Sequence, residues 1–249
     1  MKWDESFGYL VGKSLNEAFE KGKGSSAELN LMLLAALRSQ EIEAYPLLTS
    51  TRENGKVIDL YPFLSQFDHL MVFAVLDEYE YILDVGNNMR SMGMPRIPGL
   101  NKKGWIADSE KSKWIEIVPK KSMDFYSFNL KLDEEGSIEG SAKYAYTGYN
   151  AMSERMDYEK DDSDKNRHER LETKYPDLEI RDFKVENLNN LKKPFKQTFN
   201  LKITEAGQAV GDFIYFSPIL ISDFEENIFR QTEHNYPVDI PYPLVEQIN

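Results

Sequence analysis

The chain has 249 residues, of which 41% are hydrophobic and 12% aromatic, a composition that excludes a disordered protein and allows one large domain or two ordinary ones. Its 42 acidic and 30 basic residues give a formal charge of -12, and without a cluster of basic residues this charge argues against a nucleic-acid partner. The absence of cysteine excludes disulfides, thiolate metal sites and thiol catalysis, and the three histidines lack metal-ligand spacing, so we expect no cofactor and no metal.

No apolar run approaches the roughly 18 residues of a membrane span, and the opening MKWDESFGYL lacks the pattern of a signal peptide. The sequence therefore indicates either a cytoplasmic protein or a mature or truncated piece of a longer one. Met1 leads into the first domain without a cap or a polar preamble, which favours a truncated piece.

The first predicted element is a helix that begins at Ser25 or Ser26. Gly22 and Gly24 let the approach loop turn sharply, and Ser25 with Glu28 fits the S-x-x-E capping box. Hydrophobic residues follow at helical spacing, namely Leu29, Met32, Leu33, Ala36 and Leu37. Counting back along this face places Ser26 on the packed side of the helix.

A hairpin is the next strong prediction. After the stretch AYPLLTST, the segment HLMVFAVLDEYEYILDV indicates two strands joined at residues 77–79. Pairing across that tip places His69 and Asp84 at the same edge of the sheet. The stretch GMPRIPGLNKKG is then expected to be a long loop, followed by the strand KWIEIVP, which ends at Pro119.

A second domain is expected from Lys120, so that the predicted domains are residues 1–119 and 120–249. Alternating patterns predict strands around the turn DEEG, in LEIRDFKVENL, in FKQTFNLKITEAG and in FIYFSPIL, with a charged helical insertion at about 150–174. Four tyrosines of this domain could form a sugar-binding platform, although packing explains them more simply: Tyr144, Tyr146, Tyr149 and Tyr158. His168 and His234 lie among charges and carry no functional signal.

The order Ser26, His69, Asp84 fits the roles of nucleophile, general base and orienting carboxylate. The stretches GKGSSAELNLMLLAALRSQEIEAYPLL and FDHLMVFAVLDEYEYILDVG resemble the transglutaminase-like branch of the papain-like fold. In that branch a cysteine opens the core helix, a histidine starts a strand after an FNH-like turn, and an aspartate ends the next strand in an LDxT-like motif. The resemblance implies an α+β fold in which this helix packs on an antiparallel sheet, followed by a β-rich domain with a helical insertion.

Two positions depart from that pattern. The family cysteine corresponds to Ser26, and the threonine of the LDxT-like motif corresponds to Gly86. A helix N-terminus and a neighbouring imidazolium lower the pKa of a thiol, whereas a serine hydroxyl gains little from that field. The resemblance therefore implies a degenerate site that has lost catalysis. Ser26 could also be only a helix cap, His69 a strand-end residue, and Asp84 a turn former.

A narrower resemblance is to a group of large envelope proteins of Bacteroidetes. It is carried by Trp3 and by the stretches GSSAELNLML, AYPLLTSTRENG, YPFLSQFDHL and YPVDIPYP. It implies an extracytoplasmic location, in the periplasm or envelope, and flanking domains beyond this chain. Trp3 would then either cover the cleft or pack in the core.

Three functions stay open at this point. In the first, the degenerate site binds a peptide or a glycan-linked chain, or serves only as a scaffold. In the second, the domain is an active amide-bond hydrolase, in which Ser26 attacks, His69 is the base and Asp84 holds the imidazole tautomer. In the third, the chain is an assembly module for envelope proteins, and its second domain carries the function.

Overall fold

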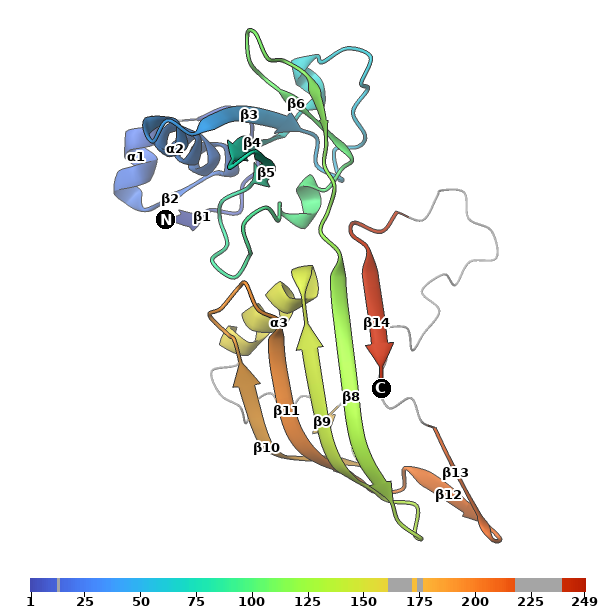
Figure 1. Ribbon diagram of the computed structural model, residues 1–249. Coiled ribbons are helices and arrows are strands. Elements are labelled where there is room, and N and C mark those ends of the chain that lie inside the picture. The colour runs from blue at the N-terminus through green and yellow to red at the C-terminus, as the bar shows by residue number, and fades with distance from the viewer. Residues whose placement is uncertain (13, 161–171, 174–176, 218–238) are drawn as a thin grey trace. The chain divides into compact units, whose positions relative to one another are not determined.

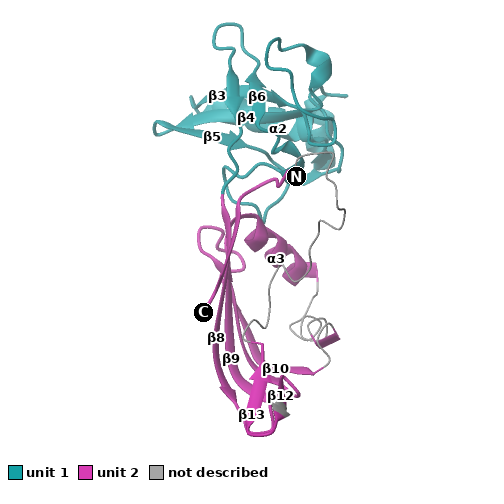
Figure 2. Cartoon of the chain, turned by 90° about the vertical axis from the view of Figure 1, so that its right-hand side faces the viewer, with its two compact units in different colours: residues 1–120 teal, residues 121–249 magenta. Residues whose placement is uncertain are grey.

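The computed structural model describes residues 1–12, 14–160, 172–173, 177–217 and 239–249 (Figure 1). These residues form a mixed α+β protein that divides into two compact units, Met1–Lys120 and Lys121–Asn249 (Figure 2). The boundary expected from the sequence lies one residue earlier. None of the helices in the described residues is long and apolar enough to cross a membrane.

The first unit is built on an antiparallel sheet with the strand order β5-β4-β3-β6-β7. Its strands are β3 (Glu43–Thr49), β4 (His69–Leu76), β5 (Tyr79–Leu83), β6 (Lys103–Ile106) and β7 (Trp114–Glu116). The predicted hairpin is β4–β5, and its tip is the two-residue turn of Asp77 and Glu78, whose positive φ angles of 48° and 68° suit a type I′ turn. The first six residues of β4 are buried, because this strand lies inside the sheet and is covered on both faces.

Helix α2 (Ser26–Ser39) begins where the sequence predicts. The side chain of Ser25 accepts a hydrogen bond from the backbone N–H of Glu28, and the Glu28 side chain accepts one from the N–H of Ser25, which completes the capping box. Leu34 packs on the sheet against side chains of β3, β4 and β5 in one buried cluster: Ala44, Val72, Ala74 and Leu83.

The predicted packed face of this helix was only partly right. Ser26 and Leu29 are buried, but Ala36 is exposed and Met32 is only half-buried. The helix is apolar on almost every side between Leu29 and Leu37, so the hydrophobic spacing alone left the direction of packing ambiguous. The face that meets the sheet includes the polar Asn30, which is fully buried.

The N-terminal residues form elements that the sequence did not predict. Helix α1 (Leu15–Lys21) is capped by Ser14 and ends at Gly22, whose φ of 64° is the left-handed conformation typical of a glycine cap. Strand β1 (Lys2–Trp3) pairs in parallel with β2 (Lys23–Gly24). This pairing brings the start of the chain alongside the approach to α2.

The long loop expected between β5 and β7 is also only partly correct. Strand β6 begins inside the last two residues of that predicted loop, at Lys103, and pairs with β3. It was missed because its four residues carry little hydrophobic pattern and its partner lies more than 50 residues earlier in the chain. A short 3₁₀ helix at Ile97–Gly99 lies earlier in the same loop.

The second unit contains a long curved sheet with the strand order β10-β11-β9-β8-β14 (Figure 1). Its strands are β8 (Ser122–Leu132), β9 (Ile138–Tyr146), β10 (Leu178–Glu186), β11 (Phe195–Ile203) and β14 (Leu244–Ile248), and β14 pairs with β8 in parallel. A separate hairpin joins β12 (Gly207–Val210) to β13 (Phe213–Phe216). The sequence predicted neither β12 nor β14.

Helix α3 (Gly148–Lys160) supplies the described part of the predicted insertion, and residues 161–171 and 174–176 lie outside the described residues, as do His168 and His234. Ala151 of this helix belongs to the buried core, which is rich in aromatic rings of the sheet. Tyr144, Tyr146 and Tyr149 are buried and Tyr158 packs against the same core, so these tyrosines are packing residues rather than a sugar platform.

Candidate functional site

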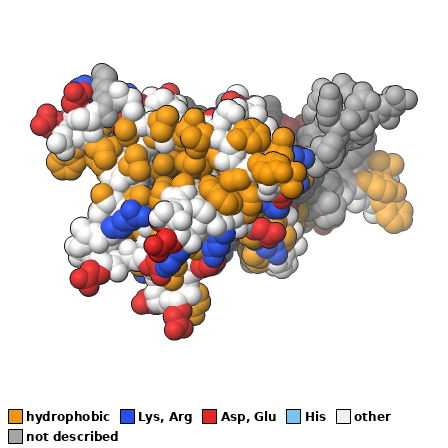
Figure 3. Space-filling model, turned by 90° about the horizontal axis from the view of Figure 1, so that it is seen from above, with side chains coloured by type: hydrophobic (Ala, Val, Ile, Leu, Met, Phe, Trp, Pro, Cys, Tyr) orange, Lys and Arg blue, Asp and Glu red, His pale blue; other side chains and the backbone are white. Residues whose placement is uncertain are grey.

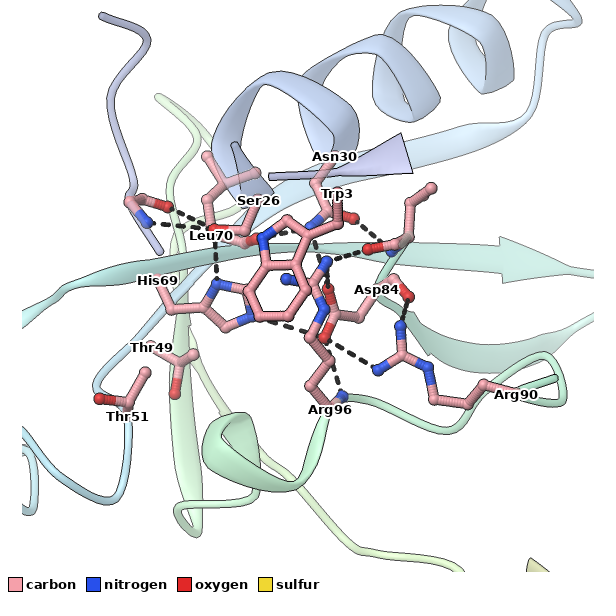
Figure 4. Close-up of polar contacts among 12 residues, drawn as sticks. Trp3, Ser26, Asn30, Thr49, Thr51, His69, Leu70, Asp84, Arg90 and Arg96 are labelled. Atoms are coloured by element: carbon pink, nitrogen blue, oxygen red, sulfur yellow. Dashed lines mark hydrogen bonds and ion pairs between the residues drawn. The ribbon is translucent and has the colours of Figure 1, made fainter. Parts of the chain in front are cut away.

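The structure brings Ser26, His69 and Asp84 together at one edge of the sheet of the first unit (Figure 4). Ser26 is the first residue of α2, His69 is the first residue of β4, and Asp84 directly follows β5. The Oγ atom of Ser26 lies 3.2 Å from Nδ1 of His69, and Nε2 of His69 lies 3.5 Å from Oδ2 of Asp84. The three side chains therefore form a chain from a hydroxyl through an imidazole to a carboxylate.

The charge on Asp84 decides how the protons of this chain are arranged. Burial raises the pKa of Asp84, but the interactions with His69, Arg90 and Arg96 outweigh burial and hold the pKa below its ordinary value. An ionised carboxylate beside Nε2 favours the imidazole tautomer with its proton on that nitrogen. The lone pair of Nδ1 then faces the Ser26 hydroxyl, which is the arrangement that a general base requires.

Two arginines of the loop after β5 hold Asp84 in place. Nη2 of Arg96 lies 3.0 Å from Oδ1 of Asp84, and the backbone N–H of Arg96 donates to Oδ2 at 2.8 Å. Nη1 of Arg90 lies 3.5 Å from Oδ2. The sequence analysis missed both arginines, because charged residues in a Gly- and Pro-rich loop are usually solvated, whereas these side chains are buried.

Asn30 joins the helix to both strands and was also missed. It lies one turn after Ser26, and its Nδ2 donates to the backbone oxygen of Leu70 at 2.9 Å and to Oδ1 of Asp84 at 3.0 Å. The backbone N–H of Val85 donates to Oδ1 of Asn30 at 2.9 Å. A lone amide within the apolar run LNLMLL was the signal in the sequence, because a polar residue inside a buried helix needs partners.

Residues 2–8, here called the strap, cover the site. The backbone N–H of Ser26 donates to the carbonyl oxygen of Ser6 at 3.0 Å, and the N–H of Gly8 donates to Oγ of Ser26 at 3.1 Å. The ring of Phe7 meets the His69 ring edge to face, with centroids 5.0 Å apart. Ser26 and His69 consequently have 0% of their surface exposed, so the hydroxyl has no open approach.

Trp3 completes this cover. Its indole packs on Phe7 with ring centroids 5.2 Å apart, and the guanidinium carbon of Arg96 lies 4.3 Å from the indole centroid (Figure 4). Of the two roles considered from the sequence, Trp3 therefore covers the site. A groove of about 420 Å³ lies beside the strap, lined by strap residues, by α1 and by the start of α2.

Gly86, which stands where the resemblance has a threonine, makes room for this cover. Its φ is 132°, a conformation that favours glycine, and a Cβ atom at this position would lie 3.1 Å from Cβ of Trp3 and 2.9 Å from Nη2 of Arg96. A threonine side chain would therefore collide with Cβ of Trp3 and with the guanidinium group of Arg96, which holds Asp84. The second departure from the family pattern thus lies at the point where the strap meets the site.

Comparisons with known protein families, curated proteins and solved structures return no match for this chain. Within the described residues, no group of three or more histidine and acidic side chains is arranged to hold a metal ion. The function is therefore argued from the Ser26, His69 and Asp84 geometry and from the strap that covers it.

Proposed function

We propose that the first unit is a transglutaminase-like domain whose degenerate Ser26–His69–Asp84 site binds an extended chain without turning it over. The motif order supports this assignment, as does the placement of the three residues at a helix start, a strand start and the end of the neighbouring strand. On the same resemblance, we propose an extracytoplasmic location in the envelope, which cell fractionation with an antibody against the chain would test.

The observation that carries the proposal is that the reactive groups are already satisfied within the chain. The hydroxyl of Ser26 accepts from Gly8 N–H and lies 3.2 Å from His69, while the Ser26 N–H, a natural donor to an oxyanion, is bound to Ser6. A serine hydroxyl also needs more help than a thiol, because its ordinary ionisation lies far above neutral pH. A buried serine with an occupied oxyanion donor therefore supports binding rather than turnover.

A fluorophosphonate probe tests the absence of turnover. We expect no labelling of the wild-type chain and none of the Ser26→Ala variant, with a serine hydrolase in the same reaction as the positive control. Labelling of the wild type that disappears in Ser26→Ala would overturn the proposal.

The Ser26→Cys variant tests whether the electrostatics of a thiol site persist. Because the chain has no cysteine, the new thiol would be the only one, and its ionisation can be followed by the ultraviolet absorbance of the thiolate. The helix N-terminus and His69 should keep the thiolate at pH values well below the ordinary thiol pKa of about 8.5. A thiol that titrates near 8.5 would remove the physical basis for calling the site a degenerate thiol site.

An amide-bond hydrolase is the second candidate, and the 3.2 Å contact between Ser26 and His69 favours it. In that reaction Oγ of Ser26 attacks the amide carbon and its proton passes to Nδ1 of His69 and then to the leaving amine. Water releases the acyl group from the serine ester in the second half. The strap would have to leave first, so this candidate predicts labelling by the fluorophosphonate in variants with a weakened strap.

An envelope assembly module is the third candidate; the second domain was expected from the sequence to carry this function, whereas the surface that favours it lies on the first unit. Hydrophobic side chains gather in a broad band on the face of the first unit in Figure 3. The loop before β4 exposes several large side chains, with Leu60 72% and Tyr61 66% exposed, and such surfaces often bind other proteins. This candidate predicts that a partner recovered from an envelope fraction by the wild type is lost with Leu60→Ser but kept with Trp3→Ala.

A further inference from the structure

The strap lies on the first unit in the way that a bound peptide would. Its contacts are backbone hydrogen bonds to β2, to the start of α2 and to the start of β4. Lys2 N–H donates to Gly22 O at 2.8 Å and Asp4 N–H to Gly24 O at 3.0 Å. In the other direction, Ser6 O accepts from Ser26 N–H and Gly8 O accepts from Leu70 N–H, each at 3.0 Å. The strap thus donates through its first residues and accepts through its later ones, and such backbone hydrogen bonds are how an extended chain adds to an existing structure.

Two aromatic side chains of the strap supply the remaining contacts. Phe7 packs on His69, and Trp3 packs on Arg96. Nε and Nη1 of Arg96 are buried and have no hydrogen-bond partner within the described residues. Beneath the strap the unit therefore presents two backbone N–H donors, two carbonyl acceptors, an imidazole and a guanidinium, all of which would need a new partner if the strap left.

We infer that the strap is a resident ligand, and that in its place the site binds an extended polypeptide with two aromatic side chains four residues apart. This inference rests on the proposed function, since a ligand that stays bound requires a site without turnover. The groups that the strap uses for these bonds are its own backbone N–H and C=O groups, regularly placed at every second residue, and this pattern favours a polypeptide over a glycan strand. Gly86 also contributes to the binding of the strap, because a larger residue there would collide with Trp3.

A tethered strap hides this site from external ligands. A segment linked by a short connection competes at an effective concentration on the order of millimolar. An external peptide with the same contacts therefore gains little binding until the strap is weakened. Removing the Trp3 and Phe7 rings should weaken the strap and leave unchanged the backbone groups of the unit to which the strap is bound.

The experiment titrates a fluorescent peptide with the sequence of residues 1–12 into the full chain and measures anisotropy. We expect the Trp3→Ala/Phe7→Ala variant to bind the peptide at least tenfold more tightly than the wild type. The matched control is Phe19→Ala, which removes an exposed aromatic ring of α1 and should bind like the wild type. A scrambled peptide and chitohexaose should not bind. Equal binding by wild type and double variant, or by the scrambled peptide, would overturn the inference, and binding of chitohexaose alone would overturn the ligand class.

Hydrogen exchange gives a second test, first on the wild-type chain and then on the double variant. If the strap exchanges, the amides of Ser26 and Leu70 should open together and faster than the amide of Val72 in the middle of β4. The added peptide should slow this exchange in the double variant. Exchange of Ser26 and Leu70 only with global unfolding would show that the strap is a permanent part of the fold.

The two proposals fail in different ways. Fluorophosphonate labelling of the double variant, with peptide binding as expected, would replace the non-catalytic function by the hydrolase and leave the strap as its cover. If a folded double variant shows neither labelling nor peptide binding, the inference of a resident ligand is wrong and the proposal of a non-catalytic site stands.

Discussion

Replacing the Asp84 carboxylate by an amide tests the electrostatic logic of the site. Asp84 is fully buried, and its carboxylate faces the guanidinium groups of Arg90 and Arg96, whose side chains are almost completely buried as well. Asp84→Asn keeps the shape of the side chain but removes its charge. It also puts an amide NH₂ group, a hydrogen-bond donor, next to the N–H donors of Arg90 and Arg96. One buried anion would then no longer balance two buried cations.

The expected loss of stability follows from that imbalance. Breaking a buried ion pair by removing one partner destabilises a protein by about 3–5 kcal/mol, because the remaining charge is left without compensation. With a urea m-value of about 1.5 kcal/mol/M, this loss corresponds to a lower midpoint by about 2–3 M. The amide can still accept from the backbone N–H of Arg96, so a value near the lower end is expected.

Tryptophan fluorescence during urea unfolding measures this effect for the first unit alone, because all three tryptophans lie there: Trp3, Trp105 and Trp114. Asp59→Asn is the matched control, since it removes the same group from an exposed pair with Lys103. The control should leave the midpoint unchanged. A shift for Asp84→Asn no larger than that of Asp59→Asn would refute the claim that Asp84 balances the two arginines.

Three further predictions use the same measurements. The pKa of Asp84 is lowered in the folded chain, so the stabilisation by its carboxylate is complete above about pH 4 and is lost as the pH falls toward the folded pKa. The difference between the urea midpoints of the wild type and Asp84→Asn should therefore shrink from pH 5 to 3 and stay constant from pH 5 to 8. Asn30→Ala would leave Leu70 O and Val85 N–H, among other groups, without their partner, and the first unit should lose about 1–3 kcal/mol of stability for each of them. A urea midpoint equal to that of the wild type would contradict this. In the second unit, the buried Arg155 donates to three backbone oxygens in the loop between β10 and β11. Arg155→Met should therefore speed hydrogen exchange in those two strands without changing the urea midpoint measured by tryptophan fluorescence. Unchanged exchange would show that these bonds do not hold the loop.

The start of α2 and the β4–β5 hairpin were predictable because their signals are local. The capping box of Ser25 and Glu28 needs only four residues, and the hairpin needs only two alternating runs and a polar tip. The hairpin alone placed His69 and Asp84 at one edge of the sheet, whereas the proximity of Ser26 to His69 was expected from the resemblance. The direction in which α2 packs was not predictable in the same way, because apolar side chains surround the helix and the buried polar Asn30 broke the pattern.

The strap, β6 and the arginines escaped prediction for a different reason. The strap is held mainly through backbone groups, which every residue carries, so residues 4–8 show no distinctive pattern. Strand β6 has only four residues, and it joins the sheet by pairing with β3, far away in the sequence, as well as with β7. Arg90 and Arg96 lie in a loop, and only the fold brings Asp84 close enough to make their burial favourable.

The two positions that depart from the resemblance, Ser26 and Gly86, both lie where the strap meets the site. The neutral Ser26 hydroxyl fits between the N–H of Gly8 and the His69 ring as an ordinary hydrogen-bonding group. A side chain at Gly86 would keep Trp3 and Arg96 apart, whereas glycine lets them meet. The Ser26 N–H, which would donate to an oxyanion, is bound to Ser6 O, so the strap would have to leave before an amide carbonyl could use that donor. One segment engages the Ser26 hydroxyl, the Ser26 N–H and the approach to both, and these contacts support the proposal that the site holds a chain rather than cuts it.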